Sequence, residues 1–203
     1  MTSWKTTLVI TGVAAATFFA GRASTSLTAQ EPHKKDAAQE MAEWQEAAGK
    51  VGMRHKVLDA FTGTWKAEVT AWMDPSAEPM VMPGTMTNDW VMDGKFLRQK
   101  FTGDFLGEKF TGLGYWGFNN ATKEYESVWL DSTNTAITVS TGKPDVNEHT
   151  FTTHGVEVDP RSGQKVRIKS VTTVQDKDHH TFERYYMTDG GPVKGMKIAY
   201  TRG

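Results

Sequence analysis

The chain lacks cysteine altogether, and this absence excludes several kinds of chemistry. Disulfides, thiol nucleophiles, iron–sulfur clusters and cysteine-type zinc sites all require a thiol. The chain also lacks an excess of charge of either sign, since 23 basic residues stand against 24 acidic ones and the formal net charge is −1. Sequence-independent nucleic-acid binding needs a dense basic face, so we expect no nucleic-acid partner.

Long hydrophobic runs are also scarce, and the main one lies near the N-terminus. It extends from Leu8 to Ala20, follows Lys5 and precedes small and polar residues. A helix of this length, at about 1.5 Å per residue, is shorter than the ~30 Å hydrocarbon core, so we expect no stable membrane span. The arrangement is typical of a secretory signal. We therefore expect residues 1–30 to be a signal peptide, cleaved or kept as an anchor, and the domain to be secreted or periplasmic in a bacterium.

Residues 31–54 show helical spacing of apolar side chains. Intervals of four, three, four and three separate Ala37, Met41, Trp44, Ala48 and Val51, which places them in one stripe along a helix. We expect a helical lead-in or linker that docks on the following domain as a spacer or lid. The alternative is that the helix at 36–48 binds a protein partner.

From residue 63 onward the period changes from helical to alternating, in segments of eight to ten residues. In the first segment Trp65, Ala67 and Val69 fall on one face, with Lys66 and Glu68 opposite. Glycine, proline, asparagine and aspartate separate the segments, as in sandwiches and barrels. After this segment, strands are predicted at 84–92, 95–104, 109–118, 124–131, 135–142, 148–157, 165–174, 180–187 and 194–202.

Ten strands joined by short turns form an antiparallel meander, which most simply closes into a barrel because closure removes exposed edges. A short helical pattern in Val57, Leu58 and Phe61 is expected to plug one end. The predicted fold is therefore all-β: residues 55–203 form a roughly ten-stranded barrel behind an N-terminal helical segment. Barrels of more than eight strands tend to keep an internal cavity.

The predicted first and last strands carry two short motifs, Gly63-Thr64-Trp65 and Tyr200-Thr201-Arg202. Together they resemble the calycin arrangement of lipocalins and fatty-acid-binding proteins. The resemblance implies that Trp65 packs under the barrel floor and that Arg202 lies across its ring. Such a cation–π pair would be a structural closure of the barrel.

Further short stretches recur along residues 55–202. They are His55-Lys56 with Leu58, Gly94 with Phe96-Leu97-Arg98, Gly112 with Gly117, Val128-Trp129-Leu130-Asp131, Asp159-Pro160 with Gly163, and Met196. With the two motifs above, they resemble a bacterial family of secreted domains of unknown function, which implies a fold and a compartment but no activity. A more distant resemblance, through the Gly-Thr-Trp opening, is to nitrobindin-type barrels, which hold haem through a histidine.

Residues 112–117 match the dinucleotide pattern G-x-G-x-x-G letter for letter. That pattern needs a strand before it and a helix after it, whereas a turn and another strand follow here. We interpret the glycines as places where a strand bends or leaves room in the barrel lumen.

Enzyme motifs are missing, so no catalytic residue is assigned and the enzyme question stays open, with a binding role favoured. The chain has no G-x-S-x-G elbow and no recognisable Ser, His and acid order. The six histidines show no metal-ligand spacing, so we expect no metal and no resident cofactor. If haem is bound, His154 is the candidate ligand.

Ligand-binding candidates are large or charged side chains in or beside the predicted strands. These lumen candidates are Trp90, Met92, Arg98, Trp116, Trp129, Asp131 and Tyr200. Arg98 or Asp131 would meet a polar head group, although Asp131 as a strand-end acid could instead bind amides of the next turn. The leading hypothesis is an extracytoplasmic barrel that holds a small apolar or amphipathic molecule. The alternatives are a protein-interaction module with a self-filled barrel and a haem-binding barrel.

Overall fold

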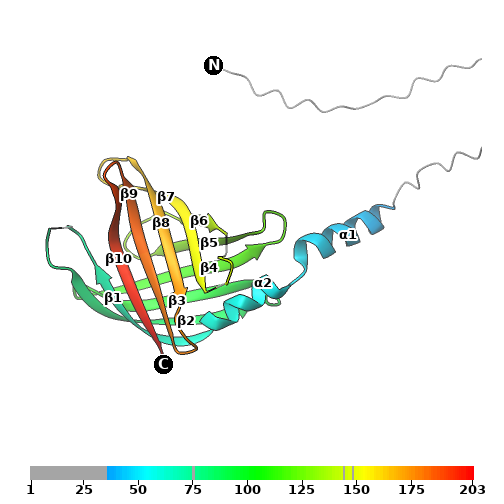
Figure 1. Cartoon of the computed structure of the whole chain (residues 1–203), viewed down its shortest axis with the longest axis horizontal. Helices are drawn as coiled ribbons and strands as arrows, with labels where there is room; N and C mark the ends of the chain where they lie inside the picture. Colours follow the sequence, from blue (N-terminus) through cyan, green and yellow to red (C-terminus); the bar gives the residue numbers. More distant parts are fainter. Residues whose placement is uncertain (1–35, 75, 144, 148) are drawn as a thin grey trace, which may run out of the picture. The chain divides into compact units, whose positions relative to one another are not determined.

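The computed structural model describes residues 36–203 apart from positions 75, 144 and 148 (Figure 1). Short helices come first and strands follow, at the point where the period changes. The helices are α1 (Ala37–Gly49), α2 (Met53–Lys56) and η1 (Val57–Phe61). The strands are β1 (Gly63–Ala71), β2 (Met80–Val91), β3 (Phe96–Phe105), β4 (Glu108–Asn119), β5 (Glu124–Asp131), β6 (Thr138–Gly142), β7 (Thr150–Val158), β8 (Lys165–Val174), β9 (His179–Thr188) and β10 (Gly191–Arg202). The predicted signal peptide, residues 1–30, lies outside the described residues.

The ten strands close into one antiparallel barrel. Each strand pairs with the next along the chain, and β1 closes the ring by pairing with β10. In Figure 1, β8, β9 and β10 run side by side in sequence order, as a meander requires. The predicted all-β meander barrel with an N-terminal helix is confirmed.

Alternation along each strand decides which side chains point inward. In β1, Trp65, Ala67 and Val69 are buried while Lys66 and Glu68 are exposed. Cα partners on neighbouring strands share one face of the sheet, so the inward face can be followed from β1 around the whole barrel.

A single turn of 3₁₀-helix, η1, closes one end of the barrel. Its Leu58 and Phe61 are 0% and 2% exposed. The carbonyl oxygen of Phe61 accepts hydrogen bonds from Trp65 Nε1 at 2.8 Å and from Asn88 Nδ2 at 2.7 Å. The apolar residues and these two bonds from β1 and β2 hold η1 as the expected plug.

Arg202 closes the same end from the last strand. Its guanidinium carbon lies 4.1 Å from the centroid of the Trp65 ring. Its Nη1 donates to the carbonyl of Thr62 at 2.9 Å and its Nη2 to that of Lys177 at 2.7 Å. The structural role predicted for Trp65 and Arg202 is thus seen in the geometry.

Helix α1 begins at a capping aspartate, since Ala38 N donates to Asp36 Oδ1 at 3.4 Å. The predicted apolar stripe is present, but Met41 and Trp44 are 55% and 67% exposed and none of the described residues of α1 is buried. The expectation of a lid that docks on the barrel through this stripe is therefore wrong, and the role as a spacer stays a prediction. Within residues 36–203, leaving out the three undescribed positions, no helix combines the length and hydropathy that a membrane crossing requires.

Candidate functional site

Two buried apolar clusters occupy part of the barrel interior. The floor cluster lies against η1 and consists of Leu58, Phe61, Leu97, Trp116, Tyr125 and Phe151. The wall cluster lies on β1, β2, β3 and β10 and consists of Trp65, Ala67, Val69, Met86, Phe101, Ile198 and Tyr200. Trp116 and Tyr200, both predicted to face the lumen, face inward but are 6% exposed, so they belong to the packed core.

The floor cluster is a set of aromatic rings in edge contact. The Phe61 ring lies 5.0 Å from that of Trp116 and 5.5 Å from that of Phe151, centroid to centroid. Burial raises the pKa of Tyr125 to about 12, and its hydroxyl donates to the carbonyl of Arg54 at 2.9 Å. These contacts make this end of the interior a closed structural core.

His180 of β9 points into the barrel. It lies between two rings, stacked on Tyr200 at 4.3 Å and edge-on to Trp65 at 4.3 Å. Burial, together with the charge of Arg202, lowers its pKa to about 3, so the imidazole is neutral. The sequence analysis did not single out His180, although its alternation with Phe182 on the strand predicted at 180–187 was the available signal.

His154, the candidate haem ligand, points the other way. It is exposed, whereas its neighbour Thr153 is buried and faces inward. A side chain on the outer face cannot reach the lumen, which corrects the choice of His154. His55 caps α2 by accepting a hydrogen bond from Gly52 N at 3.1 Å. Among the described residues, no three His, Asp or Glu side chains gather as a metal-binding group.

An ion pair between Arg184 of β9 and Glu157 of β7 lies inside the barrel. The two side chains are 15% and 23% exposed, and Arg184 Nη1 donates to Glu157 Oε1. The same oxygen accepts from Thr138 Oγ1 at 3.3 Å. Burial, followed by the Glu157 charge, raises the pKa of Tyr186. Sequence reasoning did not single out either member of this pair.

Two polar atoms beside this ion pair are buried and have no hydrogen-bond partner among the described residues. They are Arg184 Nε and Ser170 Oγ. Ser170 and Arg184 are Cα partners on β8 and β9, so their side chains lie next to each other on the inward face. We call Thr138, Glu157, Ser170 and Arg184 the inner polar patch.

Beside the inner polar patch, Trp129 of β5, the Cα partner of Thr138, lies over glycines of β4. A Cβ atom on Gly112 would lie 2.2 Å from the Trp129 ring, and one on Gly114 would lie 2.9 Å from it. The glycines thus seat Trp129 against β4, in line with our interpretation of the G-x-G-x-x-G letters. Trp129 Nε1 donates to Asp131 Oδ2 at 3.1 Å, and Asp131 Oδ1 accepts from Thr133 N at 2.9 Å. The alternative reading of Asp131, an acid that binds a turn amide, is therefore correct.

Two lumen candidates lie outside the barrel. Met92 sits in the turn after β2 with φ of 52° and is 68% exposed. Arg98 alternates with the buried Leu97 and pairs with Asp89 on the outer face at 2.6 Å, which lowers the pKa of Asp89. The prediction that Met92 and Arg98 line the lumen is therefore wrong. Strand β2 ends before residue 92, and the side chain of residue 98 points to the outer face of β3.

Trp90 faces inward near the plug, and its role there is structural. Its Nε1 donates to Asp59 Oδ1 at 2.7 Å, and its side chain packs against the floor cluster. Three of the lumen candidates therefore belong to packed clusters of the interior, namely Trp90, Trp116 and Tyr200. Met92 and Arg98 lie outside the barrel, and Trp129 is a partly exposed side chain of the interior.

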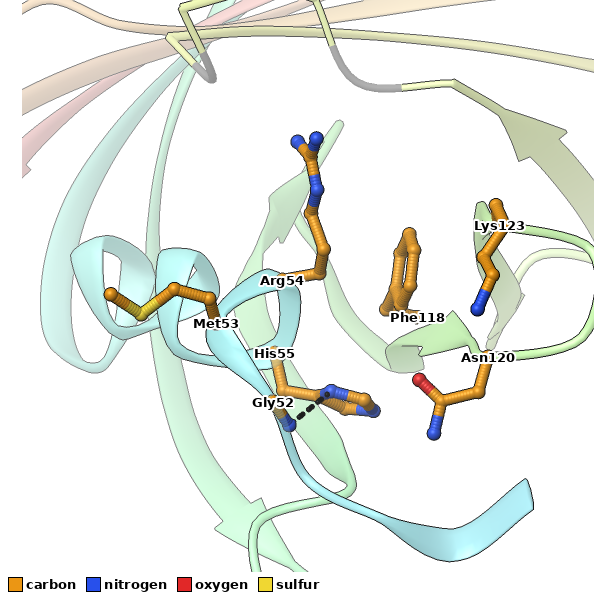
Figure 2. Close-up of a pocket in the computed structure, with 7 residues that line it drawn as sticks. All are labelled: Gly52, Met53, Arg54, His55, Phe118, Asn120 and Lys123. Atoms are coloured by element: carbon orange, nitrogen blue, oxygen red, sulfur yellow. Dashed lines mark hydrogen bonds between the residues drawn. The ribbon is translucent and has the colours of Figure 1, made fainter. Parts of the chain in front are cut away.

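A separate pocket of about 380 Å³ lies beside α2 (Figure 2). Its lining contains two basic side chains and one amide side chain and comprises Gly52, Met53, Arg54, His55, Phe118, Asn120 and Lys123. Asn120 Nδ2 donates to the carbonyl of Lys50 at 2.8 Å, which fixes one wall. A second pocket, of about 440 Å³, lies on the outer face and includes His154. Neither pocket contains a residue of the inner polar patch.

Comparison with a crystal structure gives the same fold. The crystal structure of Rv2717c from M. tuberculosis matches with a TM-score of 0.56 and 13% identity, over 76% of this chain and 99% of that chain. A redesigned β-barrel matches with a TM-score of 0.38 and 13% identity, over 73% of this chain and 96% of that one. No curated protein matches the chain.

Comparison with protein families gives a match over residues 50–202, to DUF1579, described as a protein of unknown function. The match spans all ten strands together with α2 and η1. The chain therefore belongs to the DUF1579 family.

Proposed function

We propose that this domain is an extracytoplasmic binding protein that holds a small, largely apolar molecule inside the barrel. The observation that carries the proposal is the Arg184–Glu157 ion pair, which is directed inward and only partly exposed. Removing a charged pair from water costs free energy, and a well-packed apolar interior would often be more stable. A barrel filled only for stability has no need of such a pair.

Apolar side chains that remain partly exposed supply the rest of the binding surface. Met82, Phe110, Trp129, Phe182 and Met196 pack on the wall cluster without being buried. Ligand sites combine such apolar walls with a few placed polar groups. The mixture favours an amphipathic molecule whose apolar body lies on these side chains.

The location outside the cytoplasm is supported by the sequence. The cationic start and short apolar run of residues 1–30 are typical of a secretory signal. Fractionation of the host cell, with the chain detected by antibody, tests this part of the proposal. Recovery in the cytoplasm at full length would overturn it.

The binding proposal is tested by filling the interior. We expect the full chain to bind the apolar dye N-phenyl-1-naphthylamine at one saturable site, with energy transfer from tryptophan. Thr172 of β8 faces inward, since it is the Cα partner of the inward Phe182, whereas the adjacent Val171 faces outward. Thr172→Trp should abolish dye binding, and the matched Val171→Trp should retain it.

The controls for this experiment are circular dichroism and native mass spectrometry. Both variants must keep the wild-type near-ultraviolet spectrum. Binding that survives in a folded Thr172→Trp chain would place the dye outside the barrel and overturn the proposal. Native mass spectra and a visible absorption spectrum of the chain from its own host identify a co-purifying ligand, and we expect no haem band.

A second candidate function is protein interaction through α1. The exposed Met41 and Trp44 favour it, because large apolar side chains on a helix that does not use them for docking are typical of partner surfaces. Crosslinking in the host envelope should capture a partner that is lost in Met41→Gln/Trp44→Gln. The matched control is Met53→Gln on α2, where the side chain is 77% exposed. Equal capture by all three chains would reject α1 as the surface.

A further inference from the structure

The inner polar patch presents two unused hydrogen-bond donors at one place. Ser170 is 4% exposed, and its Oγ has no partner among the described residues; the same holds for Arg184 Nε. Directly opposed side chains on antiparallel strands have Cβ atoms about 4.5–5.5 Å apart, so both donors can reach one atom between them. Buried polar groups are nearly always hydrogen-bonded, so this pair of donors indicates a bound acceptor.

The charge beside these donors determines which kind of acceptor fits. Arg184 already carries the Glu157 carboxylate on Nη1, so the pair is neutral overall. A second carboxylate on Arg184 Nε would lie close to Glu157, and like charges in a partly buried site repel strongly. The field of Glu157 reaches its surroundings, since it contributes to the raised pKa of Tyr186. An uncharged acceptor avoids this repulsion.

Apolar side chains border the two donors of the inner polar patch. On β10 the Cα partner of Arg184 is Met196, and the guanidinium carbon lies 5.6 Å from the Phe182 ring centroid. The donors on β8 and β9 are therefore bordered by a thioether and an aromatic ring. A molecule placed there meets donors at one end and an apolar surface along its body.

We propose that Ser170 Oγ and Arg184 Nε jointly receive an uncharged hydrogen-bond acceptor, such as the carbonyl oxygen of a ketone, ester or amide, at the polar end of an apolar ligand. This inference rests on the proposed function and names the ligand chemistry of the same interior. Ser170 and Arg184 are then binding residues, and Glu157 is a positioning residue that also excludes carboxylates.

A series of three naphthalene probes on the full chain tests the proposal. The first carries a ketone, 6-propionyl-2-(dimethylamino)naphthalene. The second has the ketone replaced by methylene in 6-propyl-2-(dimethylamino)naphthalene, and the third has a carboxylate in 6-(dimethylamino)-2-naphthoic acid. We expect the ketone to bind at least about tenfold more tightly than either of the others, because two hydrogen bonds to an uncharged acceptor contribute about that much or more.

Substitutions test whether Ser170 and Arg184 cause the tighter binding of the ketone probe. Ser170→Ala should weaken ketone binding about fivefold and leave binding of the propyl probe unchanged. Arg184→Lys, which keeps a cation beside Glu157 but removes Nε–H, should do the same. The matched control is Thr173→Ala, which removes an outward hydroxyl on the same strand. A merely structural role of Ser170 would weaken both probes equally.

The outcomes separate this inference from the function on which it rests. Equal binding of all three probes, or tightest binding of the carboxylate, would overturn the neutral acceptor while leaving an apolar-ligand barrel in place. Binding of none of them, together with the failure of the apolar dye, would overturn both. The wild-type probe series decides the point even if a variant fails to fold.

Discussion

The two parts of the barrel interior are built from opposite kinds of side chain. The closed end, around η1, is filled by the rings of the floor cluster, whose centroids lie about 5–6 Å apart. The inner polar patch instead carries an ion pair and two unpartnered donors. Both regions face the barrel interior, and β7 is the strand that contributes a side chain to each of them, Phe151 and Glu157.

The difference in composition indicates that the closed end stabilises the barrel and that the inner polar patch binds the ligand. Aromatic burial at the closed end releases water and gives close packing, so it stabilises the barrel. Charges and unused donors at the inner polar patch lower stability unless a ligand satisfies them. Substitutions at the two places should therefore change different measured quantities.

The largest expected effect is at the closed end. Phe61→Ala removes a ring that is 2% exposed and contacts Trp116 and Phe151, which should lower the free energy of unfolding by about 3–5 kcal/mol. Urea denaturation measures the change. The matched control is Phe96→Ala on the outer face, where the side chain is 40% exposed and the loss should be below about 1 kcal/mol. Equal losses of unfolding free energy in Phe61→Ala and Phe96→Ala would contradict the stabilising role of the closed end.

An intermediate effect is expected where Trp129 packs over Gly112. In Gly112→Ala the new methyl group would lie 2.2 Å from the Trp129 ring, so the ring must move into the interior. We expect a loss of about 1–3 kcal/mol in stability, together with weaker dye binding. Gly117→Ala is the control in the same motif, because its methyl group meets Phe96 at 2.7 Å on the outer face and should leave dye binding intact. Unchanged dye binding in a folded Gly112→Ala chain would mean that Trp129 does not contact the dye.

Much of the fold was predictable from the sequence because the barrel's alternation is regular in its early strands. The position of Arg202 over Trp65 was implied by the resemblance to calycins. Trp65, Ala67 and Val69, in contrast, show the inward face directly by their alternation. Local patterns of this kind depend only on side-chain period and on turn residues.

The inner polar patch was not predicted because β7 reverses the usual pattern. Val156 and Val158 are 48% and 50% exposed, while Glu157 between them points inward. A charged residue is assigned to the outside by default, and only stepping in twos from the buried Phe151 shows its true face. The same parity rule places Arg98 outside, where the sequence interpretation had it inside.

The contacts that define the patch are also long-range. Glu157 and Arg184 come from β7 and β9, which are joined through β8, and Thr138 comes from β6. Their meeting depends on the register of three strand pairs, and a slip of one residue at any of them would turn a side chain to the other face. Sequence spacing alone does not contain that register.

The smallest expected effect is a pH dependence near the closed end, where His180 lies between Trp65 and Tyr200 and meets the Phe61 ring edge-on. Its pKa of about 3 in the folded chain is below the ordinary value of 6.5. The unfolded chain therefore binds more protons between these values, so stability is complete above pH 6.5 and falls as the pH drops toward 3. The folding equilibrium constant should fall by up to about tenfold from pH 6.5 to pH 5.5.

Urea denaturation of the wild type and of His180→Phe at these two pH values isolates this contribution. Phenylalanine keeps a ring between Trp65 and Tyr200 and takes up no proton, so the variant should lose most of the pH slope. His55, whose pKa burial also lowers, is present in both chains and cancels in the difference. An unchanged slope in a folded His180→Phe chain would mean that the proton is taken up by another group, and that the burial of His180 does not make stability depend on pH.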